Sequence, residues 1–215
     1  MFDLIMFDLD GTLTDPKEGI TKCVQYALRA CGVEENDLER LTPFIGPPLV
    51  DGFMDFYRFD RETALTAVEK YRERFRDTGI FENRVFDGVK EMLASLKRAG
   101  KTIALATSKP HIFADRILEH YGLMPYFDVT VGAEFDGTRN EKAEVIREVL
   151  RLCPQADAPV MVGDRRYDVE GAHACGIPCI GVRFGYAEPE ELEQAGADWI
   201  EPDIPALTVR LLEKN

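Results

Sequence analysis

The sequence predicts an α/β fold in which helices cover an open, doubly wound and mostly parallel sheet, with an all-helical domain inserted after the first strand. Three observations support this prediction. Apolar runs of strand length recur along the chain, helical patterns alternate with them, and one long stretch near the N-terminus contains no clear buried strand.

The predicted strands are six short runs that are nearly continuously apolar. Such runs are typical of strands buried on both faces, as in a parallel sheet, whereas half-exposed strands alternate between apolar and polar residues. The runs are DLIMF at 3–7, TIALAT at 102–107, DVTVGA at 128–133, PVMVG at 159–163, PCIGV at 178–182 and ADWI at 197–200.

Helices are predicted between these strands from their capping signals and apolar spacing. One helix follows Asp87 as its cap and closes at Gly100, and a second opens at Pro110. A third has a capping box, TRNE at 138–141, and ends near Leu152. Strands and helices alternate in this way in a Rossmann-like sheet.

Residues 16–84 are predicted to form the helical insertion. Asp15-Pro16 supplies a helix start signal, a second helix is expected over 61–77, and the chain must turn around the prolines at 43, 47 and 48. Residues 1–15 and 85–215 would then form the α/β core.

The composition limits the possible ligands. The 215 residues include 26 basic and 39 acidic side chains, which gives a net charge of −13. Such a surface repels phosphate backbones, so we expect no nucleic-acid-binding surface. An anionic substrate would need a local positive site or a metal ion.

The sequence also favours a cytoplasmic protein. Its five cysteines form no CxxC pair and are odd in number, so we expect them to be reduced. The start, MFDLIMFDLDG, has acids in place of the basic residues of a signal peptide, and no run approaches the ~18 apolar residues of a membrane span. We expect a monomer or weak dimer with no membrane partner.

Polar residues follow three of the predicted strands. They are Asp8 and Asp10 after the first, Thr107, Ser108 and Lys109 after the second, and Asp164, with Asp168 four residues on, after the fourth. Ligands of open α/β sheets bind beyond the carboxyl ends of the strands. If these three strands are neighbours, their polar groups converge on one crevice.

Clustered carboxylates repel one another unless a cation joins them, and oxygen ligands that leave room for water and substrate favour Mg²⁺. A phosphate could accept hydrogen bonds from Thr107 and from backbone N–H groups near Ser108, at the start of the next helix. Lys109 or Lys142 could add positive charge. Lys142 lies in a first helical turn, where the helix dipole disfavours a cation, and this conflict points to a functional role.

Each of these residues has a simpler explanation when it is taken alone. An Asp after a strand is usually a turn or cap residue, Thr107 would cap a helix, and Lys142 would be a solvated surface residue. A calcium loop is excluded, because the sixth position from Asp8 is Leu13 and the twelfth is Gly19. The occurrence of several such residues at strand ends favours a chemical site.

These motifs resemble those of the haloacid dehalogenase superfamily of phosphohydrolases, and more narrowly its phosphoglycolate-phosphatase-like branch with a helical cap. The resemblance covers nearly the whole chain. It rests on FDLDGTLTD at 7–15, ATSKP at 106–110, Lys142 in RNEKAEVI and VGDRRYDVEGAHACGI at 162–177, and FIGPPL at 44–49 resembles the cap segment that faces the active site in this branch. Similar bacterial proteins are described as phosphoglycolate phosphatase-like or as 5′-nucleotidases.

The resemblance implies a Mg²⁺-dependent phosphatase acting on a small phosphorylated metabolite such as phosphoglycolate, a nucleotide or a sugar phosphate. It implies that Asp8 is the nucleophile that forms an aspartyl-phosphate and that Asp10 is the general acid and base. Thr107 and Lys142 would neutralise the transferring group. One departure weakens phosphoglycolate as the substrate: its phosphatases commonly have Lys-Pro in the third motif, where this chain has Lys142-Ala143.

The resemblance also implies a metal site. Mg²⁺ would be bound by the Asp8 carboxylate, the Asp10 backbone carbonyl and Asp164, with Asp168 holding the site directly or through water.

Two other functions stay open. A phosphomutase of the β-phosphoglucomutase type has a similar scaffold, although such enzymes usually read DLDGV where this chain has Thr12. A non-catalytic metal-binding or partner-binding domain is the other alternative, and the intact set of acids argues against it.

Overall fold

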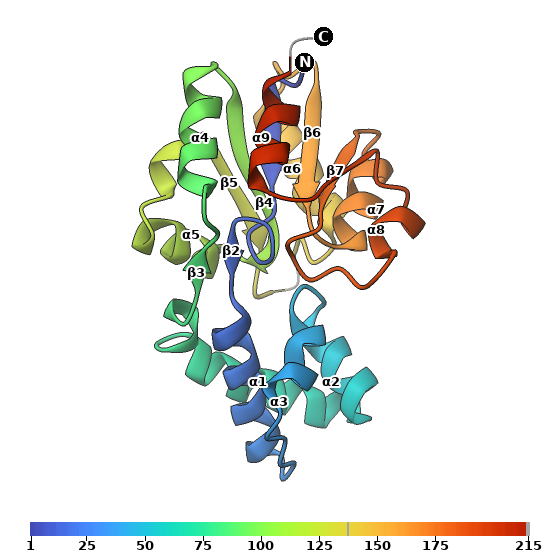
Figure 1. Cartoon of the computed structure of the whole chain (residues 1–215). Helices are drawn as coiled ribbons and strands as arrows, with labels where there is room; N and C mark the ends of the chain where they lie inside the picture. Colours follow the sequence, from blue (N-terminus) through green and yellow to red (C-terminus); the bar gives the residue numbers. More distant parts are fainter. Residues whose placement is uncertain (137, 214–215) are drawn as a thin grey trace. The chain divides into compact units, whose positions relative to one another are not determined.

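The computed structural model describes residues 1–136 and 138–213, and the chain forms two compact units (Figure 1). One unit comprises Met1–Thr14 and Val85–Asn215, and the other comprises Asp15–Arg84. Residues 137, 214 and 215, which fall in the range predicted for the α/β core, lie outside the described residues. The unit boundaries fall within two short strands, β2 (Thr14–Asp15) and β3 (Arg84–Val85).

The larger unit is built on a six-stranded parallel sheet, as the sequence predicts. Its strands lie in the order β5-β4-β1-β6-β7-β8, and each pair of neighbours is parallel. The six predicted runs all form strands: β1 (Leu4–Phe7), β4 (Thr102–Pro110), β5 (Val129–Ala133), β6 (Pro159–Gly163), β7 (Cys179–Val182) and β8 (Trp199–Glu201).

The strand order places three strand ends next to one another. From β1 the chain first adds β4 and β5 on one side, and it then returns to add β6, β7 and β8 on the other side. The carboxyl ends of β4, β1 and β6 are therefore neighbours at the position where the strand order reverses. Open α/β sheets bind their ligands at such positions.

The helices of this unit follow the strands and pack against the sheet. They are α4 (Val89–Arg98), α5 (His111–His120), α6 (Lys142–Leu152), α7 (Arg166–Ala174), the short α8 (Glu191–Gln194) and α9 (Ile204–Leu212), with a 3₁₀ turn η3 (Met124–Tyr126). α4 packs against α9, and α6 packs against α7.

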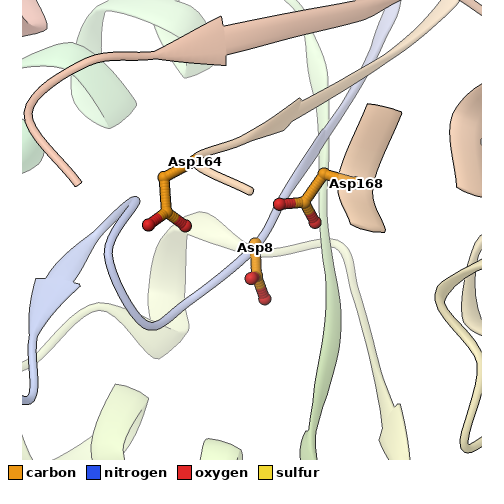
Figure 2. Close-up of side chains that lie close together, drawn as sticks. All are labelled: Asp8, Asp164 and Asp168. Atoms are coloured by element: carbon orange, nitrogen blue, oxygen red, sulfur yellow. The ribbon is translucent and has the colours of Figure 1, made fainter. Parts of the chain in front are cut away.

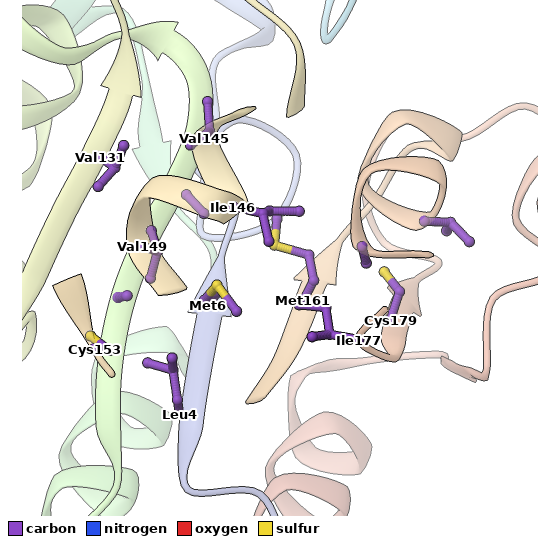
Figure 3. Close-up of a cluster of buried hydrophobic side chains, with 14 of the residues drawn as sticks. Leu4, Met6, Val131, Val145, Ile146, Val149, Cys153, Met161, Ile177 and Cys179 are labelled. Carbon is purple, nitrogen blue, oxygen red and sulfur yellow. The ribbon is translucent and has the colours of Figure 1, made fainter. Parts of the chain in front are cut away.

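One face of the sheet and two of these helices share a hydrophobic core. Leu4 and Met6 of β1 point to the same face because side chains alternate along a strand. They are fully buried together with Val145 and Ile146 of α6 and Met161 of β6 (Figure 3). This core fixes the first turns of α6 and α7 relative to the ends of β1 and β6.

The capping signals identified the helices but misplaced two of their starts. The third helix does not begin with TRNE: α6 begins at Lys142, and the Glu141 N–H donates to Glu144 Oε2 at 3.3 Å. Thr138 belongs to a separate turn, since its N–H donates to Asp136 Oδ1 at 2.9 Å. Similarly, the residue that precedes α4 is Gly88 and not Asp87.

The smaller unit is helical in its described structure. It contains α1 (Lys17–Ala30), α2 (Leu49–Tyr57) and α3 (Arg61–Phe75), with 3₁₀ segments η1 (Leu38–Phe44) and η2 (Gly79–Phe81). α1 packs against α3, η1 and η2. The sequence predicted α1 and α3 but only a turn where α2 lies. The prolines at 43, 47 and 48 indicated a turn, and α2 begins directly after the last of them.

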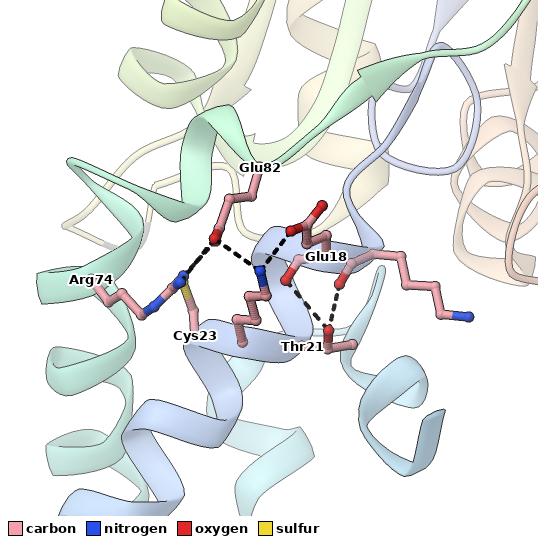
Figure 4. Close-up of polar contacts among 7 residues, drawn as sticks. Glu18, Thr21, Cys23, Arg74 and Glu82 are labelled. Carbon is pink, nitrogen blue, oxygen red and sulfur yellow. Dashed lines mark hydrogen bonds and ion pairs between the residues drawn. The ribbon is translucent and has the colours of Figure 1, made fainter. Parts of the chain in front are cut away.

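A polar cluster ties the end of this unit to its first helix (Figure 4). Arg74 of α3 donates to both carboxylate oxygens of Glu82, at 2.6 and 3.0 Å. Lys22 of α1 donates to Glu82 at 3.3 Å and to Glu18 at 2.6 Å. The segment that leaves the unit is thereby held against the helix that enters it.

All five cysteines are outside disulfide bonds in the described structure, and Cys23, Cys153 and Cys179 are buried. Within residues 1–136 and 138–213, every helix is too short or too polar to cross a membrane.

Candidate active site

Three buried aspartates come together at the carboxyl ends of β1 and β6 (Figure 2). Asp8 directly follows β1, Asp164 directly follows β6, and Asp168 lies in the first turn of α7. Each offers a carboxylate oxygen, and these three oxygens lie within 4.8 Å of one another. The exposed fractions of Asp8, Asp164 and Asp168 are 9%, 0% and 1%, so their charges are shielded from water.

Asp164 is held by two hydrogen bonds. The Thr12 hydroxyl donates to its Oδ1 at 3.3 Å, and the Tyr186 N–H donates to its Oδ2 at 2.7 Å. Burial, and then the charges of Asp168 and Asp8, raise the pKa of Asp164 well above its usual range. A cation would relieve this repulsion.

Asp168 is placed by the start of its own helix. The Arg165 N–H donates to its Oδ2 at 3.1 Å, and its Oδ1 lies 2.7 Å from the Lys142 ammonium. Burial, together with the charge of Asp8, raises the pKa of Asp168 to about 6, although Lys142 acts in the opposite direction.

Lys142 supplies positive charge to two members of this group, Asp8 and Asp168. Its Nζ lies 3.0 Å from Asp8 Oδ1 and 2.7 Å from Asp168 Oδ1, and it donates to the Ala106 carbonyl of β4 at 3.1 Å. Burial alone would lower the pKa of Lys142, but the two carboxylates more than offset that effect and raise it, so the side chain stays charged. Its location in the first turn of α6 is stabilised by these contacts in spite of the helix dipole.

Asp10 stands apart from this cluster. Its Oδ2 forms an ion pair of 2.5 Å with Lys109 Nζ, and its Oδ1 is buried without a hydrogen-bond partner among the described residues. Burial is the main reason that the pKa of Asp10 is raised; Lys109 opposes the rise and Asp8 adds to it. The predicted contribution of Asp10 to the metal site is its backbone carbonyl, and the Asp10 side chain pairs with Lys109.

The predicted phosphate-binding residues lie in the last part of β4. Thr107 is buried, and its hydroxyl accepts a hydrogen bond from the Lys109 N–H at 3.2 Å. The register between β4 and β5 shifts between Ala106 and Pro110, so Ser108 and Lys109 lie in an irregular stretch directly before α5. The backbone here therefore departs from the hydrogen-bonding pattern of a regular strand.

The acidic cluster fits a divalent cation with oxygen ligands. Asp8 Oδ1 and Asp168 Oδ1 are buried and have no hydrogen-bond partner of good geometry in the described structure, and the Lys142 ammonium lies 3.0 and 2.7 Å from them. Three carboxylates with one lysine leave an excess of negative charge, and hard cations such as Mg²⁺ prefer such oxygens. Among the residues that the structure describes, this is the one group of His, Cys, Asp and Glu side chains with metal-ligand spacing.

Two glycines that sequence reasoning did not single out make room for the cluster. A Cβ on Gly11, whose φ is +82°, would lie 2.1 Å from Asp164 Oδ2, and a Cβ on Gly163 would lie 2.1 Å from Asp168 Cγ. Gly11 lies in the motif at 7–15 and Gly163 in the motif at 162–177, so their places in these motifs could have identified them from the sequence.

Glu191 is a further supporting residue that the sequence did not reveal. Its Oε1 accepts hydrogen bonds from Arg165 Nε at 2.9 Å and from the Arg166 N–H at 2.8 Å, next to Asp164 and Asp168. The contact joins α8 to the segment between β6 and α7. No motif marked it, because the two partners are 25 or more residues apart in the sequence.

The sequence profile described as "Haloacid dehalogenase-like hydrolase" matches residues 5–182 of this chain. A protein named 5′-nucleotidase from Pseudomonas aeruginosa is 51% identical over 204 residues, which cover 94% of this chain and 92% of that protein. A protein named tyrosine-protein kinase PtkA from Mycobacterium tuberculosis is 38% identical over 192 residues, which cover 89% of this chain and 65% of that protein.

A solved structure with the same fold covers the whole chain. The crystal structure of a predicted phosphatase from Clostridium acetobutylicum superposes with a TM-score of 0.94 at 44% identity, and the match covers 100% of both chains.

Proposed function

This chain belongs to the haloacid dehalogenase-like hydrolases and is a phosphatase, and we propose that it hydrolyses a small phosphomonoester through an aspartyl-phosphate intermediate with Mg²⁺ as its cofactor. The observation that supports this proposal best is the buried group of Asp8, Asp164 and Asp168, in which Lys142 pairs with Asp8 and Asp168. Asp10, two residues from Asp8, pairs separately with Lys109.

The separation of Asp8 from Asp10 suits two different tasks. An Asp8 oxygen attacks phosphorus, the bond from phosphorus to the leaving oxygen breaks, and Asp10 gives its proton to that oxygen. In the second step Asp10 takes a proton from water as the water oxygen attacks phosphorus. The bond from phosphorus to Asp8 breaks, and inorganic phosphate and the free carboxylate result.

Lys142 balances charge during both steps. Its ammonium contacts the Asp8 oxygen that would become negatively charged again when phosphate leaves. Fixed charges of this kind stabilise a transition state because they need no reorganisation during the reaction.

Asp8, Asp164 and Asp168 would hold the Mg²⁺ ion. When bound, Mg²⁺ supplies the positive charge that offsets the carboxylates and attracts the phosphate dianion. Thr107 and the N–H groups of the irregular end of β4 would donate to the remaining phosphate oxygens.

A nucleoside monophosphate is the substrate class that the relatives favour, because the 51% identical protein is named a 5′-nucleotidase. Phosphoglycolate is less favoured, since Ala143 follows Lys142 where Pro is common. We further infer that residues 16–84 act as the cap that selects the substrate. A phosphate-release screen over ~80 phosphorylated metabolites, ranked by kcat/KM, would test this assignment.

Replacement of the nucleophile tests the mechanism. Asp8→Asn should abolish hydrolysis of 4-nitrophenyl phosphate in Mg²⁺, whereas Asp157→Asn, at an exposed site away from the cluster, should not change it. Peptide mass spectrometry of acid-quenched wild-type protein should find phosphate on Asp8. Full activity of Asp8→Asn would exclude Asp8 as the nucleophile.

The alternative functions predict other products. A phosphomutase would isomerise a sugar phosphate without free phosphate, and a non-catalytic domain would release none from any substrate. A kinase would require a nucleoside triphosphate. Phosphate release from a monoester with only Mg²⁺ added would exclude all three.

A further inference from the structure

We propose that Lys109 is the positioning residue for the general acid: it holds the Asp10 carboxylate by one oxygen so that the other oxygen faces the leaving group of the substrate. This inference rests on the proposed phosphatase function. Its basis is the 2.5 Å ion pair between Lys109 Nζ and Asp10 Oδ2, in which the side chains are only 7% and 13% exposed.

The two lysines of the site divide the carboxylates between them. Lys142 contacts Asp8 and Asp168, which belong to the nucleophile and the acidic cluster. Lys109 contacts Asp10. A lysine whose only purpose was to neutralise the transferring phosphoryl group would be expected beside the nucleophile, as Lys142 is.

The backbone of Lys109 is fixed on both sides. Its N–H donates to the Thr107 hydroxyl at 3.2 Å. Its carbonyl oxygen lies so close to β5 that a Cβ on Gly132 would approach it to 2.7 Å. The ammonium therefore extends from a rigid base, and a rigid base is what a positioning residue requires.

The unpaired oxygen of Asp10 is the second element of the argument. Asp10 Oδ1 is buried and has no hydrogen-bond partner among the described residues, while Oδ2 is ion-paired. Buried polar atoms normally find a partner in the folded protein, and an exception calls for a ligand or a function. The leaving oxygen of a bound phosphomonoester, which must receive one proton as its bond to phosphorus breaks, would supply that partner.

Dependence on the leaving group separates this role from simple phosphate binding. 4-Nitrophenolate leaves without a proton, whereas an alkoxide such as that of glycerol 2-phosphate needs one. The parameter kcat/KM reports only steps up to departure of the alcohol, so later use of Asp10 as a base does not affect it.

We expect Lys109→Met to lower kcat/KM for glycerol 2-phosphate by about 100-fold, within the range of general acid catalysis, and for 4-nitrophenyl phosphate by roughly tenfold or less. Asp10→Asn should show the same selective loss. Lys142→Met is the matched comparison and should lower kcat/KM for both substrates to a similar extent. Equal losses with Lys109→Met would overturn the proposal and assign Lys109 to phosphate binding.

Two further variants distinguish the loss of a positioned acid from a general loss of structure. In the Asp10→Asn background, Lys109→Met should cause no further change in the ratio of the two kcat/KM values, because the acid that it positions is absent. Gly132→Ala, which retains both charged side chains but displaces the Lys109 carbonyl, should shift the ratio in the same direction as Lys109→Met. An additive effect in the double variant, or an unchanged ratio in Gly132→Ala with native circular dichroism, would contradict the proposal.

Failure of the proposed function would look different. If wild type released phosphate from neither substrate, or if Asp8→Asn kept its activity, the phosphatase mechanism itself would be wrong. If those tests succeed and only the leaving-group ratio fails to change, the role of Lys109 alone is disproved.

Discussion

Lys142 illustrates how a residue can be unfavourable locally and favourable in the fold. A cation in the first turn of a helix opposes the helix dipole, at a cost of about 0.3–1 kcal/mol when exposed. In the structure Asp8 and Asp168 lie within 3.0 Å of its ammonium, and they raise its pKa although the side chain is buried. The ion pairs of Lys142 with the two aspartates therefore outweigh the unfavourable interaction of its charge with the helix dipole.

Gly11 offers a test of how tightly the acidic cluster is packed. Gly11→Ala should reduce phosphatase kcat by at least about 100-fold, a loss on the scale of a misplaced catalytic group, because its Cβ would displace Asp164. Gly32 has the same φ of +82° with no neighbouring atom within 4 Å, so Gly32→Ala is a matched control for backbone strain. Thermal unfolding should show a loss of about 1–2 kcal/mol for Gly32→Ala, with kcat unchanged. Equal kcat values for the two variants would contradict the packing argument.

The pKa values of the cluster predict how Mg²⁺ stabilisation depends on pH. The pKa of Asp168 rises from 3.8 to about 6 on folding, and that of Asp164 also rises. The metal-free folded chain therefore keeps protons that the unfolded chain has released, so the contribution of these groups to stability falls as pH rises from about 4 through 6.

Protons and Mg²⁺ compete for the same oxygens. We expect Mg²⁺ to raise Tm more at about pH 7.5 than at about pH 5 when measured by scanning calorimetry. Asp164→Asn should show little Mg²⁺-dependent shift at either pH. A shift that is the same at both pH values in wild type would argue that Mg²⁺ binds elsewhere.

At the scale of elements, we expect the ion pair between Arg74 and Glu82 to contribute to the stability of the helical unit. Arg74 and Glu82 form a two-bonded pair in which the side chains are only 22% and 20% exposed. Desolvation makes the loss of one partner costly, because the other charge is left unpaired.

Glu82→Gln should therefore lower the free energy of unfolding by about 1–3 kcal/mol, a range suited to a partly buried charged hydrogen bond. Glu148→Gln is a matched control: Glu148, 27% exposed, accepts two hydrogen bonds from Arg151 at 2.8 Å, but the arginine that would be left unpaired is 67% exposed, whereas Arg74 is 22% exposed. Urea unfolding should show little change for this control. A larger loss for Glu148→Gln than for Glu82→Gln would refute the role of burial.

At the scale of the whole molecule, the carboxylates of the proposed metal site all belong to one unit. Asp8, Asp164 and Asp168 lie in the unit of Met1–Thr14 and Val85–Asn215. We therefore expect Mg²⁺ binding to stabilise the α/β unit more than the helical unit.

Hydrogen exchange with mass spectrometry can measure how much Mg²⁺ stabilises each of the two units. Mg²⁺ should slow exchange in peptides that contain the ends of β1 and β6 and the start of α7, because ligand binding suppresses local opening. Peptides from α1 and α3 should change much less. Protection confined to α1 and α3 would place the cation outside the acidic cluster.

The sequence alone determined the α/β class, the six strands and the acids that follow them. Continuous apolar runs such as the one that became β1 bury both faces of a strand, and this property is local. The same local information failed at α2, where prolines concealed a helix, and at the start of α6, where Glu141 and not Thr138 precedes the helix. Side-chain hydrogen bonds within a few residues decide such starts, and several candidates compete.

Only the tertiary structure decided which charges face one another. The order β4-β1-β6 brings Asp8 beside Asp164, 156 positions later in the chain, and it divides the two lysines between Asp10 and the acidic cluster. Tyr186 and Glu191 gained their roles in the same way, through contacts between segments that are distant in the sequence. The physical reason is that side-chain charge and burial act through space, whereas propensity and periodicity act along the chain.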